Sequence, residues 1–194
     1  YISETIDLTA LNAYLAKKNE TETDFRYTLF HCVVAALAKT ILLRPKLNRF
    51  IANCNFYQRN ETSLSFVVKK QFSDHGAEAL AVLKAKNEDT IDSVHEDIRQ
   101  QGTFCRSDKT DSSTESMDLF SKLPRFICKT AVKFICWLDR HGWVPASLIE
   151  TDPYYTSCVI SNLGSIKLKC GYHHLTNWGT CSLFCIIGEK KQRP

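Results

Sequence analysis

The segment TSCVISNLGSI, residues 156–166, has the composition of a strand at the centre of a β-sheet. It is rich in β-branched side chains, which favour extended backbone and pack well on a pleated surface. The segment CSLFCIIGEKK, residues 181–191, has the same character. We therefore expect two central strands in the last third of the chain, separated by the stretch YHHLTNWG at residues 172–179.

Toward the N-terminus, the segment TDFRYTLFHCVVAALAKTILLRP at residues 23–45 predicts the central helix of the core. Thr23 can cap its start, and Pro45 ends it because proline has no amide hydrogen to donate. Apolar side chains recur at helical spacing at Tyr27, Phe30, Val34, Leu37 and Ile41.

The remaining segments alternate between helix and strand. The patterns predict an edge strand at residues 2–8 and a helix capped by Thr9 at residues 9–19. Residues 49–72 are expected to form two strands joined by a polar turn at residues 59–62, and residues 79–85 a third strand. Further helices are expected from Asp89 or Thr90 onward and over residues 124–142, on either side of a polar surface loop at residues 102–116. This mixed order predicts one α/β domain (an α+β two-layer arrangement) over residues 1–194, with a mixed β-sheet flanked by helices.

The composition is that of an ordinary globular chain. Its 194 residues are 44% hydrophobic, and the formal charge of +4 is interleaved along the chain, so no nucleic-acid partner is expected. Charges interrupt every apolar stretch before the length of about 20 residues that a membrane-spanning helix needs. The nine cysteines are an odd number and residues 1–11 lack the features of a secretion signal, so we expect a reducing, cytoplasmic location.

Several catalytic classes lack their sequence patterns. The chain has no CxxC pair, and the spacing is wrong for a zinc site, so no metal is expected among Cys170, His173, His174, Cys181 and Cys185. Neither a GxSxG nucleophile elbow nor a glycine-rich phosphate loop occurs. No cysteine has neighbours in sequence that are expected to activate its thiol. Metalloenzymes, α/β-hydrolases and nucleotide-binding enzymes are therefore not expected.

Five segments carry a resemblance to a known family. They are RPKLNRFI (44–51), LSFVVKK (64–70), ISNLGSI (160–166), YHHLTNWGT (172–180) and LFCIIGEKK (183–191). Together they resemble the chloramphenicol acetyltransferase-like superfamily, specifically the catalytic domain of the 2-oxo acid dehydrogenase acyltransferases and its stand-alone bacterial relatives. The resemblance implies a mixed sheet flanked by helices, a homotrimer, and a coenzyme A thioester or lipoyl acyl donor. It also implies a small-molecule thiol or hydroxyl acceptor that meets the donor at the subunit interface.

The resemblance also implies roles for particular residues. In that family a histidine of an HxxxDG motif takes the proton from the acceptor, and a hydroxyl from the facing subunit hydrogen-bonds the tetrahedral oxyanion. Ser161 and Ser165 lie closest to the position of that hydroxyl. Residues 172–179 look like HHxxxDG, but Trp178 stands where the aspartate belongs, so neither ring is expected to have a partner that fixes its tautomer. His173 and His174 are thus either weak alternatives for the base or structural residues of a packed loop.

The order of the segments places residues 172–179 in a loop that precedes the family's base motif. The resemblance therefore implies that an HxxxDG-like or DxxxDG-like motif follows Pro194 and that the domain is incomplete at its C-terminus, which leaves open whether this chain alone is active. The alternative is a non-catalytic protein of the same trimeric fold, held at a membrane surface by a helix with a basic row at Arg125, Lys129, Lys133 and Arg140. That row is also what the solvated face of a helix packed on the sheet would present.

Overall fold

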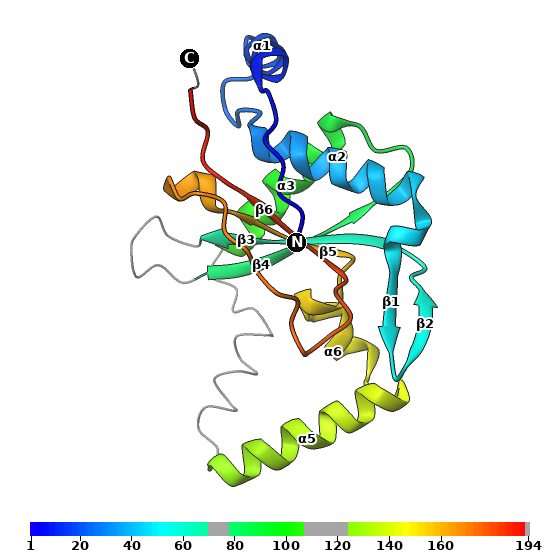
Figure 1. Ribbon diagram of the computed structural model, residues 1–194. Helices are drawn as coiled ribbons and strands as arrows, with labels where there is room; N and C mark the ends of the chain where they lie inside the picture. The colour runs from blue at the N-terminus through cyan, green and yellow to red at the C-terminus, as the bar shows by residue number, and fades with distance from the viewer. Residues whose placement is uncertain (70–77, 107–123, 193–194) are drawn as a thin grey trace.

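The computed structural model describes residues 1–69, 78–106 and 124–192 (Figure 1). Its helices are α1 (Thr9–Lys18), α2 (Leu29–Leu43), α3 (Ile91–Arg106), α5 (Arg125–His141) and α6 (Ala146–Thr151). Its strands are β1 (Arg49–Ala52), β2 (Asn55–Gln58), β3 (Thr62–Lys69), β4 (Glu78–Ala85), β5 (Cys158–Asn162) and β6 (Leu183–Ile187). Three short 3₁₀ turns are η1 (Pro45–Asn48), η2 (Pro153–Tyr155) and η3 (Leu163–Ile166).

The principal sheet has the strand order β4-β3-β5-β6. β4 pairs with β3 in antiparallel fashion, whereas β5 runs parallel to both β3 and β6. The register places Leu64 opposite Cys158 and Cys158 opposite Leu183. The sheet is mixed and flanked by helices, so the expected α/β fold class is confirmed. β1 and β2 form a separate antiparallel hairpin.

One face of this sheet carries the hydrophobic core. Phe66 and Ile160 are buried in this core. Helices α2 and α3 cover the same face of the sheet (Figure 1), and they contribute Val34, Ile41 and Val94 to the core. Burying a large apolar side chain contributes about 1.5–3 kcal/mol, so these contacts dominate the stability of the domain. α2 is the central core helix that the sequence predicts.

The opposite face of the sheet carries the predicted site residues. Because side chains alternate along a strand, Ser65, Val159 and Ser161 lie on this face. Its β3 part is covered by the segment around η2, where Ser65 Oγ donates to Pro153 O at 3.2 Å and lies 2.9 Å from Thr156 Oγ1. The chain between β5 and β6 returns along the same face, and it includes the stretch at residues 172–179.

The N-terminal segment differs from the expectation. Residues 2–8 form no strand and are largely exposed, because an alternating pattern becomes a strand only where a neighbouring strand supplies hydrogen bonds. α1 does start at Thr9, but Leu8 occupies the N-cap position. The Thr9 hydroxyl donates to Asp7 at 2.6 Å and does not cap the helix.

The segment after α2 contains one strand more than expected. Residues 49–58 fold into the β1–β2 hairpin and do not form a single strand. Asn53 and Cys54 make its turn with φ angles of 46° and 63°, and two consecutive left-handed residues are what a hairpin turn of type I′ requires. The sequence does not predict this turn clearly, because its usual sequence is Asn-Gly and the chain has Asn-Cys here.

α3 begins where expected and ends later. Thr90 and Ser93 exchange hydrogen bonds at its start, which satisfies amides that have no partner within the helix. The helix continues to Arg106, so the expected loop is wrong for residues 102–106; residues 107–116 lie outside the described residues. Gly102 costs the helix only about 1 kcal/mol, and the burial of Cys105 in the core offsets that cost.

Two buried histidines lie where α2 meets α3. α2 begins at Leu29 and not near Thr23, because the Thr28 amide and hydroxyl both contact His31 Nδ1, at 3.0 and 2.9 Å. His31 Nε2 is buried without a partner among the described residues, and the ring of His95 lies 4.9 Å away, centroid to centroid. Burial, with a smaller contribution from His95, lowers the pKa of His31 to about 4.

We expect the protein to lose stability on acidification because of His31. Between its ordinary pKa of 6.5 and the folded-state pKa of about 4, only the unfolded chain takes up the proton. The stabilisation is complete above pH 6.5 and shrinks as the pH falls toward 4, by about 3 kcal/mol in total. Urea unfolding at pH 7 and pH 4.5 measures this loss. His31→Gln keeps an acceptor for the Thr28 amide and should reduce the dependence of the unfolding free energy on pH, whereas His174→Gln should not. If the unfolding free energy of His31→Gln falls on acidification as much as that of the wild type, the assignment is contradicted.

Candidate functional site

The chain between β5 and β6 contains a loop, residues 172–182, that is fixed to η2. Gly179 has a φ of +78°, and a Cβ there would lie 2.4 Å from Tyr154 O, so only glycine fits. The amides of Thr180 and Cys181 both donate to that same carbonyl, at 3.0 and 2.8 Å. The loop therefore has one defined position against the segment that covers the sheet.

Trp178 holds the same loop from a second point. Its indole N–H donates to Asp152, which also accepts the Tyr154 amide at 2.9 Å and so caps η2. The ring of Tyr155 packs edge-on against Trp178, with centroids 6.0 Å apart. Trp178 is therefore an anchor of the loop, which explains why it stands where the resembling motif has an aspartate.

Arg59 ties the loop to the rest of the molecule. Its guanidinium donates to Tyr155 O at 2.6 Å, and to Thr180 through both the carbonyl oxygen and Oγ1. It also lies over the ring of Phe50, 4.7 Å from the centroid. Burial lowers the pKa of Arg59. The sequence analysis placed this residue in a polar turn, and nothing in its local sequence indicates its distant partners.

His173 and His174 are exposed, and both have backbone partners. His173 Nδ1 lies 2.5 Å from His174 O, and His174 Nδ1 lies 2.8 Å from Leu175 O. A carbonyl only accepts, so each ring carries its proton on Nδ1 and leaves Nε2 as the basic nitrogen. The expectation that neither ring has a partner to fix its tautomer is therefore wrong. Among the described residues, however, neither ring contacts a carboxylate.

The structure brings His173 and Ser161 to the same face of the sheet. The His173 ring stacks on Phe184, with centroids 4.2 Å apart. Phe184 pairs with Val159, and the next pair on that face is Ile186 with Ser161. His173 is thus displaced from Ser161 by one such step, about 7 Å along the strands. A substrate carbonyl bound over Ser161 would lie beside this loop.

The two candidate serines have different surroundings. Ser165 is exposed in η3, and its hydroxyl donates to Asn162 O at 2.7 Å. Ser161 is half-buried at the end of β5, and its hydroxyl makes no hydrogen bond to any other described residue. Ser161 therefore keeps a proton available for a substrate oxygen, whereas that of Ser165 is committed to the turn.

The cysteines near the sheet are poor nucleophiles. Burial raises the pKa of Cys158 to about 12 and also raises the pKa values of Cys181 and Cys185. All three are free thiols, and they stay protonated at neutral pH. Within the described ranges, no group of three or more His, Cys, Asp and Glu side chains is placed to hold a metal ion. None of the described helices is long and apolar enough to cross a membrane.

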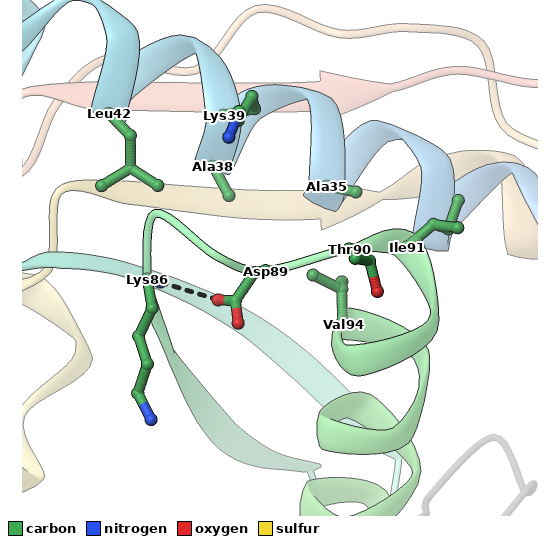
Figure 2. A pocket seen from close by; sticks show the side chains of 9 residues that line it. All are labelled: Ala35, Ala38, Lys39, Leu42, Lys86, Asp89, Thr90, Ile91 and Val94. Atoms are coloured by element: carbon green, nitrogen blue, oxygen red, sulfur yellow. Dashed lines mark hydrogen bonds between the residues drawn. The ribbon is translucent and has the colours of Figure 1, made fainter.

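A shallow pocket of about 240 Å³ lies elsewhere, between α2 and the start of α3 (Figure 2). Two of its polar side chains, Lys39 and Asp89, have hydrogen-bond partners. Lys39 Nζ donates to Asn87 O at 3.0 Å, and Asp89 Oδ2 accepts the Lys86 amide at 2.7 Å. The residues that line the pocket include no histidine, cysteine or serine, so it is not the candidate active site.

Known proteins similar to this chain were found by comparing structures and not by comparing sequences. No protein-family model and no curated protein matches this sequence. The probable dihydrolipoamide acetyltransferase of Listeria monocytogenes aligns over 97% of this chain and 63% of its own, with a TM-score of 0.60 and 14% identity. The chain has the fold of a dihydrolipoamide acetyltransferase core. The resemblance to the acyltransferase catalytic domain, inferred from the sequence motifs, is thus confirmed at the level of the fold.

Two further solved structures share this acetyltransferase fold. A truncated catalytic core of the 2-oxoacid dehydrogenase multienzyme complex from Thermoplasma acidophilum aligns over 97% of this chain and 67% of its own, with a TM-score of 0.59 and 11% identity. The dihydrolipoamide acetyltransferase of Azotobacter vinelandii aligns over 90% and 56%, with a TM-score of 0.54 and 14% identity; a serine, a histidine and an asparagine have been studied for their role in its catalytic mechanism. The chain thus spans 56% to 67% of the length of these structures.

Proposed function

We propose that this chain is part of a coenzyme A-dependent or lipoyl-dependent acyltransferase, which moves an acyl group from a thioester to a thiol or hydroxyl acceptor. The acetyltransferase fold over 97% of the chain supports the class of reaction. The observation that carries the proposal is the Ser161 hydroxyl, half-buried and without a partner among the described residues, on the sheet face beside a well-anchored loop. That is the setting of an oxyanion donor.

In the proposed reaction a base takes the proton from the acceptor S–H or O–H, and the acceptor adds to the carbonyl carbon of the thioester. Negative charge then develops on the carbonyl oxygen, and the Ser161 hydroxyl donates a hydrogen bond to it. The intermediate collapses with cleavage of the carbon–sulfur bond, and the departing thiolate receives the proton from the base. The acyl group changes carrier with no oxidation or reduction.

We propose that the base is a histidine that lies outside residues 1–194, in an HxxxDG-like motif. His173 and His174 are exposed and contact no described carboxylate, whereas a base of this kind is held by an orienting partner in a closed site. His173 remains the weak alternative, because it lies on the same face as Ser161.

The proposal includes an assembly and a location. We propose a homotrimer with donor and acceptor meeting between subunits, supported by the match to a core of a multienzyme complex; the mass of the particle in solution decides this point. A cytoplasmic location agrees with free thiols such as Cys158, which a reducing compartment keeps in that form.

Alanine at His174 or His173 tests the placement of the base. In a form of the protein that transfers acetyl groups from acetyl-coenzyme A to a thiol, either substitution should lower kcat by less than about tenfold, because the loop positions no base. Removing a general base would cost about 10²–10⁴-fold. A collapse of turnover in His173→Ala, with an unchanged circular dichroism spectrum, would place the base in this loop. Failure of the full-length protein to use any thioester would reject the proposed function itself.

A further inference from the structure

α5 differs from the other long helices because it buries none of its residues. It has 17 residues and no buried side chain, whereas α2 buries four of its 15. Phe126 is 72% exposed, Phe134 58% and Trp137 46%. Figure 1 shows α5 at the lower edge of the molecule, beyond α6 and away from the sheet. Within the described part of the chain, nothing covers this apolar stripe.

The charged side chains of α5 form a second stripe. Arg125, Lys129, Lys133 and Arg140 fall within about 80° of the helix circumference, next to the exposed aromatic residues. The one acidic side chain of the helix, Asp139, accepts the Tyr155 hydroxyl at 2.7 Å and so faces the body of the protein. The outward surface of α5 is therefore both apolar and strongly basic, with no acidic group to balance it.

An aromatic cluster stands at the C-terminal end of α5. Gly142 ends the helix in the left-handed conformation and turns Trp143 back beside it. Trp143 lies 5.5 Å from Trp137 and 5.2 Å from His141, measured between ring centroids, and is 62% exposed. Tryptophan favours the boundary between the acyl chains and the headgroups of a bilayer, where its apolar ring and its N–H are both satisfied.

We propose that α5, together with Trp143, docks on the surface of a bilayer rich in anionic phospholipids. The helix lies in the plane of the interface with its aromatic stripe in the acyl boundary and its basic stripe at the headgroups. It is about 25 Å long, and none of the described helices can span a membrane, so the contact is peripheral.

The charge pattern favours lipid over a second copy of this chain. In a two-fold contact through α5, the basic stripes of the two copies would face each other and repel. Lysine is also depleted from protein interfaces, whereas lysine and arginine beside an aromatic stripe are typical of interfacial helices. The proposal does not depend on the acyltransferase reaction.

Vesicle flotation tests the proposal with the full-length protein. We expect binding to vesicles of phosphatidylcholine and phosphatidylglycerol in a 3:1 ratio at low salt, little binding to phosphatidylcholine alone, and weaker binding at high salt, because exposed charges are screened. The tryptophan emission should shift to the blue on binding. No binding to the anionic vesicles at low salt overturns the proposal.

Matched variants separate this surface from general basicity. K129Q/K133Q/R140Q should weaken binding by about a hundredfold, at roughly fivefold per lost cation. K17Q/K46Q/K86Q removes the same charge elsewhere and should not weaken binding. F134S/W137S should abolish the blue shift. Equal losses in the two charge variants would reduce the effect to net charge and overturn the proposal. So would self-association in sedimentation that F134S/W137S abolishes, because a second copy would then cover α5.

Discussion

Ser161→Ala is expected to lower kcat for acyl transfer by about 10²–10³-fold while leaving the KM for the acyl donor nearly unchanged. The Ser161 hydroxyl makes no hydrogen bond to any other described residue, so its loss costs the folded protein little. Its proposed partner is a charge that exists only after the acceptor has attacked the thioester. An interaction made only with that charge lowers the barrier without tightening the binding of substrate.

Ser165→Ala is the matched control for this experiment. Ser165 lies four residues after Ser161 in the chain, but its hydroxyl already donates a hydrogen bond to Asn162 O. Its removal should leave kcat within about threefold and slightly loosen the turn, as for an ordinary exposed hydrogen bond. Steady-state kinetics with acetyl-coenzyme A and a thiol acceptor measure both variants. Unchanged turnover in Ser161→Ala, or an equal loss in both variants, would remove Ser161 from the proposed mechanism.

The parts of the fold that the sequence predicted correctly have strong periodicity or apolar composition, and they pack in or against the core. α2, β5 and β6 are long or strongly apolar, so local pattern and tertiary packing agree, and their existence follows from composition. Residues 2–8 alternate well enough to predict an edge strand, but they form none because pairing with a neighbouring strand is not a local property. The continuation of α3 past Gly102 likewise depends on a core contact that no local pattern shows.

The candidate site was less predictable than the fold. The family resemblance offers Ser161 and Ser165 alike as candidates for the oxyanion donor. The two serines differ in the hydrogen bond that Ser165 makes within its turn, and that bond depends on geometry that spacing does not encode. The tautomers of the two loop histidines are set by backbone carbonyls, which no side-chain motif includes.

The contacts that hold the loop at residues 172–182 could not be predicted from local sequence either. Trp178 and Asp152 are separated by 26 positions, and Arg59 and Thr180 by 121. The local sequence around each of these residues predicts only an aromatic residue in a loop or a polar residue in a turn. Their joint role follows only from the parallel pairing of β3 with β5 and of β5 with β6, which brings the three segments together.

Arg59→Met should destabilise the protein by about 2–4 kcal/mol. The substitution leaves Tyr155 O and Thr180 O without their donor, and an unpaired buried carbonyl costs about 1–3 kcal/mol. Relief of the desolvated charge opposes this loss, but methionine fills the space over Phe50 without supplying any donor. The two lost pairings are therefore the larger effect.

Urea unfolding and amide hydrogen exchange check this expectation. The amides of Thr180 and Cys181, which donate to Tyr154 O, should lose protection in Arg59→Met even below the unfolding transition, because the loop detaches first. Arg59→Lys is the control for charge: it keeps the cation but cannot reach two segments at once with one ammonium, so it should recover less than half of the lost stability. Wild-type stability in Arg59→Met would show that the guanidinium merely occupies the gap between η2 and the loop, and that Gly179 and Trp178 suffice to hold them together.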